Sequence, residues 1–486
     1  MSELEGNHGN GTSPQGVFER IKDFLTAFLD LLRVPRAFWF INVAFMIDSM
    51  AYFGILTLMT EYLYRDGGLS DLRAGWVVSF FTGLVTLFMI GIGGLAERLG
   101  VRRAVLLAVF FCLVGRVAYA GAPLLESRSL LLMGVLCGLL LSALGEGIFQ
   151  PVAYAGIKQY TDHKTNAMGY GAIYALMNLG IVFIGWLSPL VRVPVDNILE
   201  ARAQGRLEPE SIWHFLADRV TSGIMGVNWV CVVVTAVALG FYMVFMTKRA
   251  EADRIRRPEE KKQAGQGAVE ALLPWYTRVA GYFSEGPFSN VRFLFFIFML
   301  LPVQTLFAHQ WLTLPPYVLR AYSEGVADRM EWIVNWINPG IIFFGVPIAT
   351  ALTRRVNIYT MMIVGSSVSA LPTFLLGTGP HLSMLIVYLV LFSIGEALWQ
   401  PRFLQYAAEL APEGKVAQYM GLANVPWITA KMTTGLYSGY FLGQYCPERG
   451  VQDTGTLWTI YGIIAITSPI GLLLGRKWAL RGMRPA

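Results

Sequence analysis

Two stretches of the chain, GEGIFQP at residues 145–151 and GEALWQP at residues 395–401, carry the same pattern in the first and second halves of the sequence. Each opens with Gly-Glu inside an apolar segment and closes with Gln-Pro. A shorter repeat pairs LTL at residues 56–58 with LTL at residues 312–314. Because a repeat in the same order is typical of structurally equivalent units, we expect two matching halves.

The composition predicts that both halves lie in a membrane. Of the 486 residues, 55% are hydrophobic and only 14% are charged, and the mean hydropathy is +0.51. A soluble protein carries about 25% charged residues, so this chain has too little charge for a surface that faces water. These values argue against a cytosolic enzyme, a disordered chain and a secreted disulfide scaffold. The four cysteines form no pattern typical of a metal site.

Twelve segments are apolar enough and, at about 20 residues, long enough to cross a bilayer. Their expected bounds are 38–63, 74–96, 104–122, 129–157, 168–191, 222–247, 291–319, 331–352, 357–377, 382–407, 416–442 and 456–475. We therefore predict an all-α membrane protein with 12 transmembrane helices in two six-helix bundles. The predicted parts are a cytoplasmic tail with an amphipathic helix (1–37), the first bundle (38–247), a cytoplasmic linker (248–290), the second bundle (291–476) and a cytoplasmic tail (477–486).

The distribution of lysine and arginine predicts the orientation of the bundles. Cytoplasmic segments are enriched in these residues, and most of the 38 in this chain fall on the side of the two termini, including the basic run at 254–262. Both termini are therefore expected in the cytoplasm. Residues 1–15 are polar, so we expect no cleaved signal peptide.

Three segments lie outside the predicted spans. Residues 17–34 carry apolar side chains at helical spacing, which predicts an amphipathic helix on the inner membrane surface. Residues 249–286 are expected to connect the halves, with at most one surface helix. Residues 193–221 are expected to form an outer loop that contains one short interfacial helix.

Six ionisable residues lie near the middle of the predicted spans, and they are Asp48, Arg116, Glu146, His309, Glu396 and Lys431. A charged side chain at the bilayer centre costs about 2.5–3.5 kcal/mol, so such residues are either paired or functional. We expect these residues to converge on a water-accessible cavity between the two halves. There, the acids would bind and release protons.

Each acid has two interpretations. Glu396 either binds a proton or a cationic group of a solute, or it forms a structural ion pair that holds its helix. Asp48 either binds the coupling proton or makes a polar contact between helices. Glu146 either pairs with Arg116 in the neighbouring span or is a second proton site.

Each of the other candidate residues also has two interpretations. His309 titrates near neutral pH in its unperturbed form, so it either couples protons or only satisfies local hydrogen bonds. Lys431 either receives an anionic group of the solute or neutralises Glu396. Three aromatic residues either line the cavity or face lipid, namely Tyr52, Trp399 and Trp427.

The segment GLAERLGVRR at residues 94–103 resembles the loop between the second and third spans of the major facilitator superfamily. Gly94 and Gly100 would make a tight turn in it. Its charged residues would pair between helix ends and hold one conformation, and these are Glu97, Arg98, Arg102 and Arg103.

Four further segments resemble the proton-dependent oligopeptide transporter family, the peptide transporters. They are GE at 395–396 with QP at 400–401, ELAP at 409–412 and MG at 420–421; IYALMNLG at 173–180; NP at 338–339 with Pro347; and FAHQ at 307–310. These segments lie in both halves, so the resemblance covers the whole membrane domain. It implies proton-coupled symport by alternating access.

The resemblance also implies roles for individual residues. Glu396 stands where the family holds the amine of a peptide, and Asn178 and Asn338 match positions that contact the solute. Other positions depart from the family, because Gln150 replaces a lysine and His309 replaces an acid. We therefore expect a divergent, peptide-like or related polar solute, with Gln150 and Gln400 as further hydrogen-bonding groups.

The predicted function is secondary active transport across the inner (plasma) membrane of the cell, in a multi-pass monomer. Protons would be the coupling ion, and no other cofactor, metal or nucleic acid is expected. An enzyme is not expected, because the sequence has no nucleophile elbow, metal cluster or phosphate-binding loop. The sequence is also compatible with two alternatives, a proton-driven exporter of lipophilic or cationic compounds and a non-transporting membrane sensor.

Overall fold

The computed structural model describes residues 31, 33–92, 99–162, 165–206, 211–252, 287–353, 356–409, 422–423 and 425–479. In these ranges the regular structure is helical and includes no strand. The long helices of the first half are α2 (Arg36–Arg65), α3 (Asp71–Ile92), α5 (Val101–Gly121), α6 (Arg128–Tyr160), α7 (Asn166–Ala203) and α9 (Gly223–Phe245). Shorter helices are η1 (Ala122–Leu124), α8 (His214–Ala217) and α10 (Lys248–Ala252).

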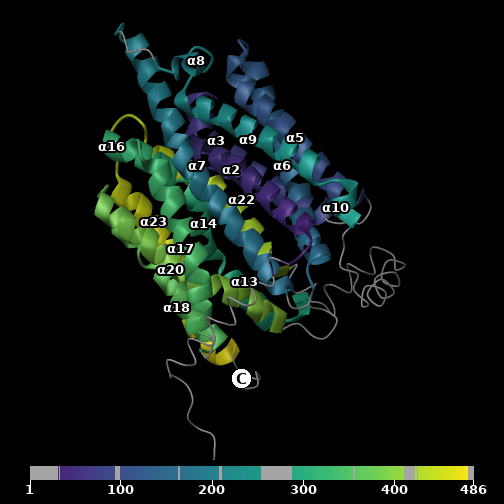
Figure 1. Cartoon of the computed structure of the whole chain (residues 1–486). Helices are drawn as coiled ribbons and strands as arrows, with labels where there is room; N and C mark the ends of the chain where they lie inside the picture. The colour runs from purple at the N-terminus through teal and green to yellow at the C-terminus, as the bar shows by residue number, and fades with distance from the viewer. Residues whose placement is uncertain are drawn as a thin grey trace, which may run out of the picture.

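The second half repeats this arrangement with more breaks. Its helices are η2 (Pro287–Ser289), α13 (Val291–Met299), α14 (Leu301–Leu312), α15 (Leu314–Ala321), α16 (Glu324–Ala327), α17 (Met330–Leu352), α18 (Ile358–Ala370), α19 (Thr373–Leu376), α20 (Leu382–Glu409), α22 (Val425–Tyr445) and α23 (Thr454–Ala479). Figure 1 shows the purple-to-teal helices of the first half beside the green-to-yellow helices of the second.

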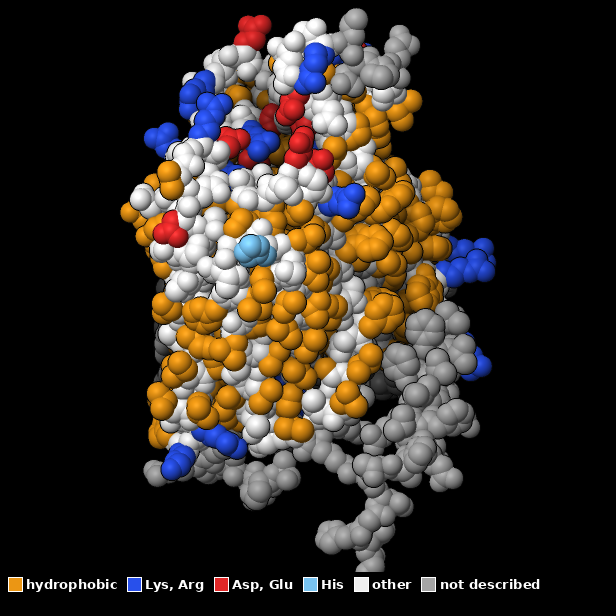
Figure 2. All heavy atoms as spheres, turned by 90° about the vertical axis from the view of Figure 1, so that its left-hand side faces the viewer, with side chains coloured by type: hydrophobic (Ala, Val, Ile, Leu, Met, Phe, Trp, Pro, Cys, Tyr) orange, Lys and Arg blue, Asp and Glu red, His pale blue; other side chains and the backbone are white. Residues whose placement is uncertain are grey.

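Ten helical segments of the described chain are long and apolar enough to cross a membrane. The predicted spans 331–352 and 416–442 correspond to α17 and α22, which are not among these ten, so the count of twelve remains a prediction. Figure 2 shows a broad apolar surface over the middle of one face, with charged side chains gathered towards its two ends. This distribution is what a bilayer requires of a helical bundle.

The predicted outer loop at 193–221 was wrong over its first part. Helix α7 continues through Pro194 to Ala203, well past the predicted end of the span at residue 191. The apolar pattern ends near Arg192, but the side chain of Arg192 is itself buried against the second half, so the helix stays packed there. Within the predicted loop, α8 is a short helix at 214–217, where one interfacial helix was expected.

Two predicted spans are interrupted. The span at 291–319 is divided into α13, α14 and α15, with breaks at Leu300 and Thr313. Proline lies at the first turn of both α14 and α15, where its missing N–H costs no helical hydrogen bond. The span at 357–377 is similarly divided between α18 and α19 by Leu371 and Pro372.

The repeated Gly-Glu pairs occupy equivalent positions in the two halves. A Cβ on Gly145 of α6 would lie 2.6 Å from the carbonyl oxygen of Ala108 in α5. A Cβ on Gly395 of α20 would lie 2.7 Å from the carbonyl oxygen of Gly365 in α18. Each glycine therefore lets its helix lie directly against the neighbouring backbone, which places the glutamate that follows it inside a bundle.

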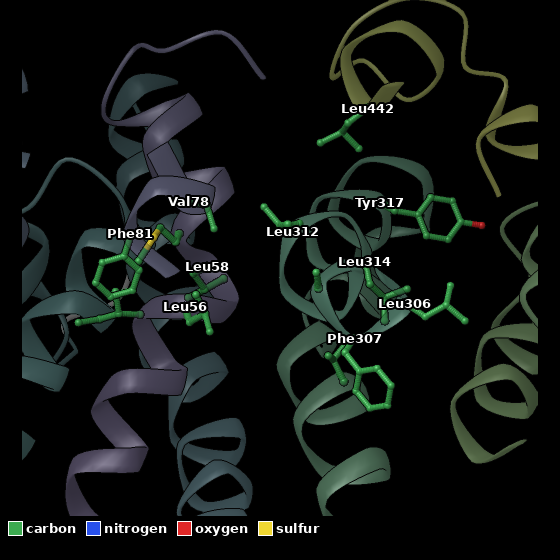
Figure 3. Packing of buried hydrophobic residues seen from close by; sticks show 14 of the residues in the cluster. Leu56, Leu58, Val78, Phe81, Leu306, Phe307, Leu312, Leu314, Tyr317 and Leu442 are labelled. Carbon is green, nitrogen blue, oxygen red and sulfur yellow. The ribbon is translucent and has the colours of Figure 1, made fainter. Parts of the chain in front are cut away.

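The apolar core is continuous across the boundary between the halves. One buried cluster includes Leu58 of α2, Val78 of α3, Leu312 of α14 and Leu314 of α15. Figure 3 shows these side chains on either side of the boundary. The halves are thus packed against each other at this level.

Several predicted features lie outside the described residues. They are most of the amphipathic helix at 17–34, most of the linker at 248–290, the C-terminal tail from residue 480 onwards, and Gly94, Glu97 and Arg98 of the loop at 94–103.

Candidate functional site

A buried charge cluster lies inside the first half. Arg116 of α5 donates to Asp48 of α2 over 2.7 Å and to Glu146 of α6 over 2.6 Å. It also donates to the hydroxyl of Thr235 in α9 over 2.5 Å. The three charged side chains are each 2% exposed. The predicted pair of Arg116 and Glu146 is therefore present, and Asp48, which the sequence interpretation did not join to it, shares the same guanidinium.

A small cavity adjoins this cluster. It is lined by Tyr52, Phe81, Tyr119, Arg116 and Glu146, together with Ile55, Leu139 and Ser142. Its volume of about 10 Å³ has room for about one water molecule. Tyr52 therefore faces the charge cluster of its own half.

The same cluster contains a group of potential metal ligands. One atom each of Asp48, Cys112 and Glu146 lies within 4.8 Å of the other two. Arg116 already bonds both carboxylates, so a metal cation would be repelled by the guanidinium at close range. The residues present are therefore a poor fit for a metal ion.

A second polar cluster lies in the second half. Asn338 of α17 donates to the Glu396 carboxylate of α20 over 2.8 Å and to the Ser393 hydroxyl over 3.0 Å. Glu396 is 5% exposed, and none of the ion pairs among the described residues includes it. Its carboxylate thus has an amide partner rather than a cation.

Two residues of the first half lie near this second cluster. Tyr174 of α7 lies within electrostatic range of the Glu396 carboxylate. Asn178, one turn further along α7, is buried and donates to the carbonyl oxygen of Tyr174 over 2.9 Å. Asn338 and Glu396 are therefore hydrogen-bonded to each other, whereas Asn178 bonds its own helix, α7, which packs against α17.

His309 has its own surroundings in α14. Its Nδ1 lies 2.8 Å from the Thr313 hydroxyl and its Nε2 lies 3.3 Å from the Tyr437 hydroxyl. Its ring lies 3.8 Å, centroid to centroid, from that of Tyr461. Both ring nitrogens have partners, and the side chain is fully buried.

The remaining predicted residues are dispersed. Trp399 is fully buried in the second half, where it packs against Phe307 and over Gly365. Trp427 is half-buried and also packs against Phe307, with ring centroids 5.0 Å apart. Lys431 of α22, Gln150 and Gln400 are half-buried as well. The structure therefore distributes the predicted residues among separate polar clusters rather than one shared cavity.

Part of the predicted conformational loop is described. Gly100 has φ +79°, a conformation that favours glycine, directly before α5. The backbone N–H of Arg102 donates to the Glu251 carboxylate of α10 over 3.2 Å. Arg103 is exposed. The start of α5 is thus tied to α10, the short helix after the last span of the first half.

Ion pairs that sequence reasoning missed join the two halves at one end of the molecule, the end that carries α16 (Figure 1). Arg320 of α15 lies 3.0 Å from Glu61 of α2 and 2.8 Å from Asp71 of α3. Burial lowers the pKa of Arg320, but the two carboxylates outweigh it and raise the pKa above its ordinary value. Arg65 extends this network from Glu61 to Glu448, at 2.6 and 3.4 Å.

A second buried pair joins the halves at the same end. Arg192 of α7 binds the Glu331 carboxylate of α17 in a bidentate manner, at 2.6 and 2.9 Å. The hydroxyl of Ser188 also donates to Glu331, over 3.1 Å. Bidentate arginine–carboxylate pairs are among the stronger hydrogen-bonded contacts in proteins.

One sequence signal could have found these pairs. Glu61 and Glu331 lie inside the predicted spans 38–63 and 331–352, where an acid is expected either to be paired with a cation or to have a function. Arg192 and Arg320 lie just beyond the ends of the predicted spans 168–191 and 291–319, in segments that would be outer loops in the predicted topology.

Comparison with known proteins identifies the family to which this architecture belongs. The sequence model of the Major Facilitator Superfamily matches residues 41–428, most of the chain. The chain belongs to the Major Facilitator Superfamily. A curated relative, an uncharacterized transporter of this superfamily, YttB from Bacillus subtilis (strain 168), is 24% identical over 143 residues. That match spans 28% of the chain and 34% of the relative.

Solved structures resemble the chain over nearly its whole length. A POT family transporter in complex with 5-aminolevulinic acid superposes with a TM-score of 0.65, at 16% identity, over 92% of this chain and 97% of that one. The peptide transporter POT in complex with sulfate gives 0.68, at 17% identity, over 93% and 96%. The predicted fold family is thereby confirmed. Family and fold are those of membrane transporters rather than enzymes.

Proposed function

We propose that this member of the superfamily couples protons to the symport of a small peptide-like or related polar solute by alternating access. It would act as a monomer in the inner (plasma) membrane, with twelve spans and both termini in the cytoplasm. The observation that carries the proposal is the buried cluster in which Asp48 and Glu146 share the single cation Arg116.

The charge of that cluster supplies the physical argument. Two carboxylates and one guanidinium sum to one negative charge, and burying an uncompensated charge is costly. A single proton on either acid makes the cluster neutral. The cluster therefore has a reason to take up one proton when it is closed from water and to release it when water enters.

The solute would bind between the halves. Glu396 is buried without a cation, so a protonated amine of the solute is a suitable partner for it, and Asn338 lies beside it. Among the structural neighbours, one is in complex with 5-aminolevulinic acid and another with a thioalcohol-conjugated peptide, and both of these belong to the POT family. A solute that carries an amine is consistent with the groups that surround Glu396.

The ion pairs at the α16 end supply the conformational part of the proposal. Arg320 and Arg192 tie the first half to the second at the end that the basic residues predict to be outside. Alternating access would require these pairs to separate when the outer side opens. Their re-formation would favour closure on that side.

The test is uptake into liposomes that contain the purified full-length protein, with imposed pH gradients. A panel of peptides, amino acids, nucleosides and amines serves as solutes. We expect an inward proton gradient to drive uptake in the parent and to lose its effect in Asp48→Asn and Glu146→Gln. Glu126→Gln, a change at an exposed acid, is the matched control.

The outcomes separate the candidates. If uptake by the parent does not depend on the pH gradient, transport is not coupled to protons. Efflux of lipophilic cations driven by protons would favour an exporter. Binding without movement of any solute would favour a sensor.

A further inference from the structure

Lys431 is a charged residue of the membrane interior for which the structure shows no charge partner. It lies in α22 and is half-buried. Among the described residues, none of the ion pairs and none of the side-chain hydrogen bonds involves its ammonium group. Its backbone carbonyl accepts a hydrogen bond from the Ser79 hydroxyl over 3.2 Å, but this contact leaves the charge unpaired.

The neighbours of Lys431 along α22 show where it lies. Met432 and Gly435 contact α3 of the first half, at Gly83 and at Ser79 respectively. Trp427 contacts Phe307 of α14. Because residues four apart share a helix face, Lys431 lies between the α14-facing side of α22 and its α3-facing side. It is therefore placed at the boundary between the two halves.

Lys431 differs from the other interior charges in how it can be neutralised. The acids Asp48, Glu146 and Glu396 can each become neutral by gaining a proton. A lysine is neutralised only by losing its proton or by meeting an anion. Glu396 is not that anion, because its partner is Asn338 on the side of the boundary formed by α7, α17 and α20. The boundary thus carries an acid on one flank and a cation on the other, each without an opposite charge.

We propose that Lys431 is the anion subsite of the solute site and holds a carboxylate group of the solute. The inference rests on the proposed function. A compact ammonium with three donors suits a carboxylate that must bind and leave in each cycle. The solute class is then one with both an amine, for Glu396, and a carboxylate, for Lys431. Both charged groups that bind it belong to the second half.

The experiment compares matched probes on the full-length protein in detergent. The probes are alanyl-alanine, 5-aminolevulinic acid and the C-terminal amide of alanyl-alanine, and the readout is the shift in melting temperature at rising probe concentration. Variants are Lys431→Met, Lys431→Arg and the control Lys477→Met, a change at an exposed lysine. If Lys431 binds the carboxylate of the solute, the parent and the control should bind the two carboxylate probes with at least tenfold higher apparent affinity than the amide.

Lys431→Met is expected to lose that preference and Lys431→Arg to keep part of it. Without a probe, Lys431→Met should melt at or above the parent temperature, since no structural partner is lost. Three results would overturn the proposal: an unchanged preference in Lys431→Met, a lower melting temperature of this variant without a probe, or stabilisation of the parent by the amide alone. Failure of the proposed function would appear separately, as uptake indifferent to the proton gradient.

Discussion

Arg116 shows at the scale of one residue how a charge is kept inside a membrane. Its guanidinium bonds Asp48, Glu146 and Thr235, which come from three other helices. A charge in the bilayer interior is tolerated when it is paired and fully hydrogen-bonded. Arg116 therefore holds α2, α5, α6 and α9 together, and the two acids depend on it.

Removal of Arg116 should be strongly destabilising. In Arg116→Met, two buried acids lose their cation, and breaking a buried pair in this way costs about 3–5 kcal/mol. We expect a clear fall in melting temperature in detergent, followed by tryptophan fluorescence. The triple variant Asp48→Asn/Arg116→Met/Glu146→Gln should recover most of the loss, because no uncompensated charge remains. A triple variant no more stable than Arg116→Met would contradict this account.

Close packing of helix pairs decides the position of both repeated glutamates at the scale of elements. Gly395 brings α20 onto the backbone of α18, as Gly145 brings α6 onto α5. The helices continue through Pro151 and Pro401, which follow the glutamates by about one turn. The repeat in the sequence is therefore a repeat of helix contacts, and it explains why both glutamates are buried.

A methyl group at Gly395 should separate these helices. In Gly395→Ala the new Cβ would lie within 2.7 Å of backbone atoms of α18, and such overpacking costs about 1–3 kcal/mol. The control is Gly171→Ala in α7, where a Cβ would meet no atom within 4 Å beyond the backbone of its own helix, and helix propensity favours alanine by up to about 1 kcal/mol. Melting temperatures of both variants check this. Equal stability of the two would show that α18 and α20 adjust without cost.

At the scale of the whole molecule, the two halves are held together at the α16 end by buried arginines. Arg320 spans α2 and α3, and Arg192 reaches α17. Indole groups add hydrogen bonds across the boundary, from Trp332 to the carbonyl oxygen of residue 186 and from Trp336 to that of residue 182. The structure is thus closed at this end.

Loss of the Arg320 network should open that end. Cys446 is fully buried beside Arg320, whose guanidinium donates to its carbonyl oxygen over 3.3 Å. In a Cys137→Ser background, Arg320→Gln/Glu61→Gln should raise the labelling rate of Cys446 by a membrane-impermeant maleimide several-fold. The second change neutralises Glu61, the more deeply buried of the two acids that Arg320 binds, so that only Asp71 loses its cation as a charged group.

The control for this measurement is Arg202→Gln, which breaks an exposed pair with Asp218. Exposed pairs contribute about 0–1 kcal/mol, so this variant should label at the parent rate. An unchanged rate in the double variant as well would mean that the apolar core, rather than the ion pairs, keeps this end closed.

The sequence by itself determined the membrane class, the two-half repeat and most of the spans, because apolar length and helical periodicity are local properties of the chain. It also offered a pair of Arg116 and Glu146 as one of two interpretations, since both lie inside neighbouring spans. Only the tertiary structure decided that Asp48 joins them, that α7 continues to Ala203, and that Arg192 and Arg320 bind acids of the opposite half. Those choices depend on which helix faces meet across the boundary, and residues far apart in the chain decide that only when they pack.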